Sequence, residues 1–298
     1  MTQTKIFDSE IVLPDETLAA RQKTLLGFDA RYGRVRDQLR LLLCLDELGA
    51  WNRKHHAGKL ALCALVAEQY PLIIFFGDVG TGKTVTAECI ANRLVMEARM
   101  EDSVLFKLSN RVRGSGKVGE MGTLIIEAFQ KVTLSAGKGR RAILVIDEGD
   151  SLATARSEDH SHHEDKVAVN TLIQCIDDLR RFGGRVVVFL CTNRVSVLDA
   201  ALRRRAAITE EFRRPNDDER RALFAMDLSS LSLAETQITH LVRATAARDG
   251  RPEWTYSDIR TRLYPAALAM AFPDRPLAFD HLRNAVAGLR SSPVMEDR

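Results

Sequence analysis

The sequence lacks two features that would place the protein at a membrane or send it across one. It has no apolar run that approaches the length needed to span a bilayer. Its start has no basic segment followed by an apolar one, because Asp8, Glu10, Asp15 and Glu16 interrupt this region. We therefore expect a protein without membrane contact, located in the cytoplasm.

Cysteine pairs, internal repeats and a strong charge of one sign are also missing. The five cysteines form no Cys-x-x-Cys pair and lie in apolar surroundings, at positions 44, 63, 89, 175 and 191. This pattern is typical of reduced thiols inside a cytosolic protein. The formal net charge of +3 is too small to indicate a nucleic-acid partner by itself. With 298 residues, the chain has room for two modest domains, each with its own hydrophobic core.

A strand followed by a glycine-rich loop is the most informative stretch. PLIIFF, residues 71–76, is continuously apolar, as expected for a strand buried on both faces of a parallel sheet. GDVGTGKT, residues 77–84, fits the pattern G-x-x-x-x-G-K-[S/T] in full. Its glycines let successive backbone amides turn toward one anion, and the next segment, VTAECIANRLV, predicts a helix whose N-terminus adds positive charge there. A chance glycine turn is the alternative, but the order strand, loop, helix favours a nucleotide site.

The residues of this loop have distinct expected roles. Lys83 is expected to reach the β- and γ-phosphates of the nucleotide, and the Thr84 hydroxyl to bind Mg²⁺. The complete predicted nucleotide-binding set of the loop is Gly77, Asp78, Val79, Gly80, Thr81, Gly82, Lys83, Thr84 and Val85.

Two further predicted strands end in polar groups suited to nucleotide hydrolysis. ILVIDE, residues 143–148, predicts a buried strand that ends in Asp147 and Glu148. Asp147 would bind the Mg²⁺, and Glu148 would polarise the attacking water. VVVFLCTN, residues 186–193, ends in Asn193, whose amide can hydrogen-bond the γ-phosphate or that water. The alternatives are solvated acids at a strand end and an ordinary turn asparagine.

Taken together, these residues resemble an AAA+ ATPase over roughly residues 25–290. ILVIDEGDSLATARSEDHSHHEDKVAVNTLIQCIDDL is similar to the acidic strand, short helix, loop and following helix of that family. LDAALRRRAAITEEF resembles the pachytene-checkpoint branch, whose members remodel HORMA-domain proteins. The compact chain is similar to bacterial members of that branch, which are found beside cyclic-oligonucleotide synthases in antiphage signalling operons (CBASS). The resemblance implies a homo-hexameric ring and a HORMA-domain protein as its substrate.

A ring of this kind supplies an arginine from one subunit to the ATP bound by its neighbour. The branch pattern aligns that arginine with Arg205, whereas the broader family pattern favours Arg204. The alternative is that RRR is a solvated basic patch or a nucleic-acid contact. Near the C-terminus, WTYSDIRTRLYPAALAMA offers Arg260 and Arg262 as a second arginine that senses nucleotide, and Arg260 is our choice. The branch alignment instead places Ile259 at this position, which departs from the family pattern.

Two loops are expected to face the pore of the ring. SNRVRGSGKVGEMG, residues 109–122, resembles the first pore loop, where AAA+ unfoldases usually carry an aromatic residue. The aligned residues here are Lys117, Val118 and Gly119, so the alternatives are a grip by aliphatic carbons, a different register or an ordinary surface loop. ARSEDHSHHEDK, residues 155–166, has three histidines without a strong metal-ligand spacing, and we favour a second pore loop over a zinc site.

The expected fold class is α/β: an AAA+ P-loop NTPase core with a parallel sheet flanked by helices, followed by a small C-terminal helical lid. We expect an N-terminal extension over residues 1–24, the core over 25–213, and the lid with a disordered tail over 214–298. Strands are predicted near 71–76, 103–108, 142–147, 186–191 and 208–212. Pro215 and Asn216 break the last strand, and the acids that follow suit the start of a helix.

The favoured function is therefore an ATP-hydrolysing, ring-forming remodeller of a partner protein, with a HORMA-domain regulator of antiphage signalling as the expected substrate. The alternative is a nucleic-acid-associated AAA+ loader of the clamp-loader or helicase-loader type, although the sequence has no recognised DNA-binding module or aromatic stacking platform. A scaffold that binds ATP without turnover is disfavoured, because such a switch has no need for Glu148.

Overall fold

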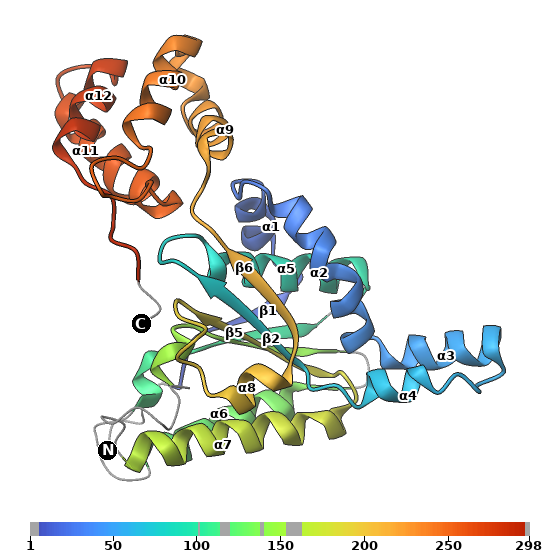
Figure 1. The fold of residues 1–298 in the computed structure, drawn as a ribbon. Helices are drawn as coiled ribbons and strands as arrows, with labels where there is room; N and C mark the ends of the chain where they lie inside the picture. Colours follow the sequence, from blue (N-terminus) through green and yellow to red (C-terminus); the bar gives the residue numbers. More distant parts are fainter. Residues whose placement is uncertain (1–5, 101, 114–119, 138–139, 153–162, 296–298) are drawn as a thin grey trace. The chain divides into compact units, whose positions relative to one another are not determined.

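The computed structural model describes residues 6–100, 102–113, 120–137, 140–152 and 163–295, and Figure 1 shows their secondary structure. The chain divides into two compact units. The first contains Met1–Phe76 and Thr84–Glu211, and the second contains Gly77–Lys83 and Phe212–Glu296. The short segment Gly77–Lys83 thus groups with the C-terminal part of the chain, although the residues on either side of it belong to the first unit.

The first unit is built on a six-stranded sheet with the strand order β1-β3-β4-β5-β2-β6. The neighbouring strands β3, β4, β5 and β2 run parallel, and β1 pairs antiparallel with β3. The strands are β1 (Phe7–Leu13), β2 (Leu72–Gly77), β3 (Ser103–Leu108), β4 (Ala142–Ile146), β5 (Val186–Thr192) and β6 (Ala206–Phe212). The predicted α/β fold with a mainly parallel sheet is confirmed.

The edge strand β1 is not among the predicted strands. Asp8, Glu10 and Val12 are exposed, whereas Phe7 and Leu13 are buried. This alternation is typical of a strand that has one face in water. The sequence signal is weak because few of its apolar residues are buried, so periodicity alone does not mark it as part of the sheet.

Both faces of the central strands are buried. Along β4, Ala142, Leu144 and Ile146 belong to one hydrophobic core, which also contains residues of helices α6 and α7. Ile143 and Val145 are fully buried as well and, by strand alternation, point to the opposite face. Figure 1 shows α6 and α7 on one face of the sheet and α1, α2 and α5 on the other. Burial on both faces explains why these strands are continuous apolar runs.

From β2 onward, strands and helices of the first unit alternate as expected for a parallel sheet, whereas four helices stand between β1 and β2. The helices are α1 (Glu16–Gln22), α2 (Phe28–Leu43), α3 (Leu45–His56), α4 (Leu62–Ala67), α5 (Lys83–Glu97), α6 (Glu120–Ser135), α7 (His163–Leu179) and α8 (Ala200–Arg205).

The second unit is mainly helical over its described residues after Phe212. Its helices are α9 (Asp217–Asp227), α10 (Glu235–Ala244), α11 (Tyr264–Ala271) and α12 (Phe279–Gly288), with a π-helical segment over Asp258–Leu263. They share a core that includes Phe224, Trp254 and Leu282. The Asn216 side chain accepts a hydrogen bond from the Glu219 backbone N–H, and the Glu219 side chain accepts one from the Asn216 N–H, each 2.9 Å. This reciprocal cap fixes the start of α9.

None of the described helices combines the length and the apolar composition needed to cross a membrane.

Candidate nucleotide-binding site

The loop Gly77–Lys83 depends on glycine at two positions. Gly77 has a φ of +135°, and a Cβ there would lie 2.0 Å from the carbonyl oxygen of Phe212. Gly80 has a φ of +76°, and a Cβ there would lie 2.7 Å from the Cβ of Ser257 and 2.8 Å from the Oγ1 of Thr255. The Ser257 backbone N–H donates a 3.1 Å hydrogen bond to the Gly80 carbonyl. The loop is therefore packed closely against other residues of the second unit.

Lys83 is held by the loop itself. Its side chain is buried, and Nζ donates 2.8 Å hydrogen bonds to the carbonyl oxygens of Gly77 and Asp78. The Thr81 hydroxyl donates a 2.7 Å bond to the same Asp78 carbonyl. The loop thus contains a buried ammonium group that can neutralise a bound phosphate.

The other predicted loop residues have less distinctive surroundings. Val79 is exposed, and its backbone N–H donates a 2.9 Å hydrogen bond to the Asp78 carboxylate. Gly82 has a φ of +89°. Val85 is half-buried in the first turn of α5.

Thr84 and Asp147 meet in the first unit although 63 positions separate them in the sequence. The Thr84 hydroxyl donates a 2.8 Å hydrogen bond to Asp147 Oδ1, and Asp147 Oδ2 lies 3.8 Å from the Nζ of Lys107. Hydroxyl and carboxylate oxygens suit Mg²⁺, which usually takes one or two protein ligands together with phosphate oxygens and water. The pair therefore fits an Mg²⁺ site. Within the part of the chain that the structure describes, no cluster of three or more His, Cys, Asp or Glu side chains forms another metal site.

Glu148 follows in a tight turn and is exposed to solvent. Its φ is +50°, and its backbone N–H donates a 3.0 Å hydrogen bond to Asp147 Oδ1. The Asn110 side-chain amide donates a 3.1 Å hydrogen bond to Glu148 Oε2. The next residue, Gly149, is buried, and a Cβ there would lie 2.8 Å from the Cδ1 of Leu190. The turn therefore fixes the Glu148 backbone and leaves its carboxylate accessible to water.

Asn193 directly follows β5 and is half-buried. Its backbone N–H donates a 3.4 Å hydrogen bond to Asp150 Oδ1, and the Thr192 hydroxyl donates a 3.1 Å bond to the same oxygen. Asp150 belongs to the turn after β4, which is the parallel neighbour of β5. Asn193 therefore lies at the same carboxyl edge of the sheet as Asp147 and Glu148.

The two candidate trans-acting arginines differ in their surroundings. Arg205 makes a two-point contact with Asp177, with Nε–Oδ1 at 2.5 Å and Nη2–Oδ2 at 2.9 Å, and its guanidinium lies 5.1 Å from the centre of the Tyr70 ring. The hydrogen bonds to Asp177 raise the pKa of Arg205 above its ordinary value. Arg204 is exposed, and its Nε donates a 3.2 Å bond to the Ala200 carbonyl of its own helix.

In the second unit, Arg260 pairs with a neighbouring acid. Its Nε and Nη2 donate 2.7 Å hydrogen bonds to the two Asp227 oxygens. These hydrogen bonds raise the pKa of Arg260 above its ordinary value. Ile259 is fully buried, and Arg262 Nη1 donates a 2.8 Å bond to Asp258. In this structure, therefore, both candidate sensing arginines bind carboxylates of their own unit.

Some predicted residues lie outside the described part of the chain. These are the pore-loop residues Lys117, Val118 and Gly119, together with His160 and His162 of the second proposed pore loop. His163 is the first residue of α7.

Four side chains near these positions are not among the predicted site residues: Asn110, Asp150, Asp177 and Arg214. Asn110 and Asp150 come soon after a strand, as Asn193 does, so a polar residue beyond each parallel strand is a usable sequence signal. Asp177 and Arg214 have no such signal, because their partners Arg205 and Asp78 are distant in sequence.

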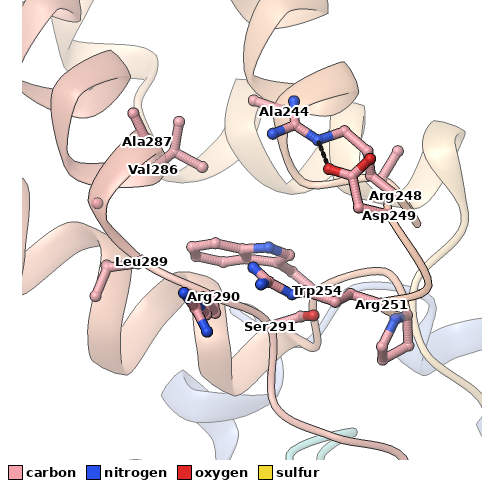
Figure 2. Close-up of a pocket in the computed structure, with 13 residues that line it drawn as sticks. Ala244, Arg248, Asp249, Arg251, Trp254, Val286, Ala287, Leu289, Arg290 and Ser291 are labelled. Atoms are coloured by element: carbon pink, nitrogen blue, oxygen red, sulfur yellow. Dashed lines mark ion pairs between the residues drawn. The ribbon is translucent and has the colours of Figure 1, made fainter.

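A cavity of about 280 Å³ lies elsewhere in the second unit, beside Trp254 (Figure 2). Its lining includes Arg248, Arg251 and Arg290 and no residue of Gly77–Lys83. It is therefore distinct from the phosphate loop.

Comparisons with known proteins show the family and the fold of the chain. Residues 73–215 match the family described as "ATPase family associated with various cellular activities (AAA)". The chain is 63% identical over 297 residues to CD-NTase-associated protein 6 of Escherichia coli strain KTE188, covering 100% of both chains. Its fold is similar to a chain in the structure of the E. coli MS115-1 HORMA:CdnC:Trip13 complex, with a TM-score of 0.88, 34% identity and 98% of each chain covered. It is also similar to Rhizobiales Trip13, with a TM-score of 0.71, 33% identity, and 97% of this chain and 100% of that one covered. The chain therefore belongs to the CD-NTase-associated protein 6 family and carries an AAA-type ATPase domain.

Proposed function

We propose that this protein is an Mg²⁺-dependent ATPase that assembles into a ring of six and remodels a HORMA-domain protein. The observation that carries the ATPase part is the 2.8 Å hydrogen bond between Thr84 and Asp147. It brings the helix that follows the phosphate loop to the acidic end of β4, where Glu148 is accessible to water.

The residues of this chain divide the work of hydrolysis between them. Lys83 and the backbone N–H groups of the loop hold the β- and γ-phosphates. Thr84 and Asp147 would hold Mg²⁺, and the bound ion would supply positive charge beside the phosphates. Glu148 accepts a proton from the attacking water or orients it, and Asn193 hydrogen-bonds the water or the γ-phosphate.

An arginine from the neighbouring subunit completes the proposed site. Arg205 is the first choice and Arg204 the second, both at the end of α8. Because Arg205 is bound to Asp177 within its own chain, it must exchange this carboxylate for the neighbour's phosphate in order to act. Arg260 is the proposed contact to nucleotide from the lid.

The partner is proposed from the relatives. A complex that contains a similar chain is described as HORMA:CdnC:Trip13, which supports a HORMA-domain protein as substrate within antiphage signalling. Lys117, Val118 and Gly119 are the proposed grip in the pore. The division into an extension (1–24), a core (25–213) and a lid (214–298), and a cytoplasmic location, are parts of the same proposal.

ATP turnover with and without a HORMA-domain protein encoded beside the gene tests this function. We expect Mg²⁺-dependent release of phosphate that rises when the HORMA-domain protein is added and does not respond to DNA. Stimulation by DNA alone would favour the loader alternative. A lack of turnover under all conditions would contradict the ATPase assignment.

A further inference from the structure

Arg214 lies at the centre of a buried polar cluster in the second unit. Its side chain is 4% exposed, and its Nε donates a 2.5 Å hydrogen bond to Asp78 Oδ2. Its Nη1 donates to the carbonyl oxygens of Glu253 (2.6 Å) and Ser292 (3.0 Å), and Nη2 donates to that of Pro293 (2.9 Å). One guanidinium thus joins the phosphate loop, the loop before the π-helical segment, and residues Ser291–Met295, which we call the strap.

The strap has a second anchor at Asp258, which is 1% exposed. Asp258 accepts hydrogen bonds from the Ser292 backbone N–H (3.1 Å), the Ser292 hydroxyl (2.6 Å) and Arg262 (2.8 Å). Burial alone would raise the pKa of Asp258, but these bonds, together with one from the Thr255 N–H, outweigh it and hold the pKa below its ordinary value. A charged carboxylate therefore fixes the strap one residue away from the Arg214 contact at Pro293.

The Asp78 carboxylate places a negative charge in the phosphate loop, and Arg214 neutralises it. A carboxylate in a loop that binds phosphate opposes the negative charge of the ligand. Asp78 Oδ1 accepts hydrogen bonds from the Val79 N–H (2.9 Å) and the Met295 N–H (3.4 Å), and the Arg214 guanidinium pairs with the other oxygen, Oδ2. Because three carbonyl oxygens orient the guanidinium, two of them from the strap, the strap helps to keep this charge in place.

The strap begins beside Trp254, whose fluorescence can indicate whether the strap is in place. Leu289 and Arg290, which precede the strap, and Ser291, its first residue, line the cavity next to Trp254 (Figure 2). Trp254 also directly follows Glu253, whose carbonyl accepts from Arg214. The sequence has only two tryptophans, and the other is Trp51 in α3. Trp51→Phe therefore leaves Trp254 as the single indole probe.

We propose that Arg214 is a positioning residue for the phosphate loop, and that the strap holds Arg214 against Asp78. The loop then binds phosphate tightly only while the strap carbonyls of Ser292 and Pro293 contact Arg214. This inference rests on the proposed nucleotide site. It adds a residue and a segment that are not part of the phosphate-loop pattern.

Titration with a fluorescent ATP analogue tests the role of Arg214 in the full chain. Arg214→Ala is expected to raise the dissociation constant by about tenfold or more, because it leaves an unpaired carboxylate in the loop. Asp78→Asn removes that charge and should recover most of the loss in the double variant Asp78→Asn/Arg214→Ala. Arg243→Ala, at an exposed arginine of α10, is the matched control and should bind as the wild type does. A merely structural role for Arg214 predicts no recovery in the double variant.

The strap is tested by two truncations and by Trp254 fluorescence. Removal of all residues from Ser291 onward should weaken binding as Arg214→Ala does, whereas removal of residues 296–298 alone should not. In the Trp51→Phe background, ATP should change the Trp254 emission of the full chain, and the change should be lost in the longer truncation.

Equal affinity of a folded Arg214→Ala variant and the wild type would overturn the proposal. If Arg214→Ala does not fold, equal affinity of the two truncations would overturn it. Failure of the nucleotide site itself would look different, because neither the wild type nor the controls would then bind the analogue.

Discussion

At the scale of residues, Lys83 and Thr84 are adjacent in the chain but have partners of different kinds. Lys83 donates to carbonyl oxygens of its own loop, whereas Thr84 donates to the carboxylate of Asp147, which directly follows β4. A bound phosphate would therefore compete with the loop carbonyls for the Lys83 ammonium, and Thr84 and Asp147 would be the residues that hold Mg²⁺. A phosphate oxygen, which carries more negative charge than a carbonyl oxygen, would be the stronger acceptor for this ammonium group.

Lys83→Ala tests the loop most simply. The substitution removes the buried ammonium group and should weaken ATP binding about 100-fold, which corresponds to about 3 kcal/mol. Lys59→Ala, at an exposed lysine between α3 and α4, is the control and should leave binding unchanged. The measurement is titration with a fluorescent ATP analogue, and equal affinities for Lys83→Ala and the wild type would contradict the assignment of the loop.

The sequence predicts the types of the site residues better than their partners. Phosphate binding requires Gly77, Lys83 and Thr84 at a fixed spacing, so the pattern can be recognised in a stretch of eight residues. The contacts of Asn110 with Glu148 and of Asp177 with Arg205 join separate elements. No local pattern encodes such pairs, because the folded sheet and its helices bring them together.

At the scale of elements, the end of β4 is held in a turn that only glycine fits. A Cβ on Gly149 would lie 2.8 Å from both Cγ and Cδ1 of the buried Leu190 on β5. Gly149→Ala should therefore destabilise the protein by about 1–3 kcal/mol through overpacking. Gly33→Ala in α2 meets nothing within 4 Å and should stabilise it by about 0.5–1 kcal/mol. Unfolding in urea measures both, and an unchanged midpoint for Gly149→Ala would contradict the packing described.

The anchor of the strap gives a pH dependence with a definite sign. Because the folded-state pKa of Asp258 lies below its ordinary value, the ionised carboxylate stabilises the folded state at pH values above about 4. That contribution is lost as the pH falls through the lowered folded-state pKa. Asp258→Asn should therefore cost about 2 kcal/mol at pH 7 and progressively less at pH values below about 4.

Thermal unfolding of the wild type and Asp258→Asn at pH 7 and pH 3 checks this dependence. Asp274→Asn, at an exposed aspartate of the same unit, is the control and should show little difference at either pH. If the difference in unfolding temperature between the wild type and Asp258→Asn were larger at pH 3 than at pH 7, the predicted direction of the pH dependence would be contradicted.

The strands differ in how well the sequence pattern predicts them. The central strands are apolar on both faces because helices cover both, so they are predicted within one or two residues. The edge strand β1 has only Phe7 and Leu13 buried, and its pairing with β3 depends on a segment nearly 100 residues away. That pairing is tertiary information, which periodicity within β1 does not contain.

At the scale of the whole molecule, the proposed ring requires an arginine to act across a subunit boundary. Arg205→Ala should leave ATP binding unchanged but lower turnover at least about 100-fold, because charge at the transition state loses its partner. Arg204→Ala is the parallel variant, and the larger loss identifies the acting residue. Mixed with Glu148→Gln subunits, Arg205→Ala subunits should regain partial turnover, since some intact arginines then face intact phosphate sites. Full turnover by Arg205→Ala and Arg204→Ala alone would contradict an arginine supplied in trans from this segment.

The proposed function requires that a ring of this protein bind its HORMA-domain partner when ATP is bound. Its most direct test is the mass of the complex that Glu148→Gln forms with that partner, measured by size-exclusion chromatography with light scattering. With ATP, this variant should keep nucleotide bound and elute as a ring with the partner attached, whereas with ADP, or with Lys83→Ala, the partner should elute alone. If Glu148→Gln binds ATP and the partner still elutes alone, the remodelling function proposed here is contradicted.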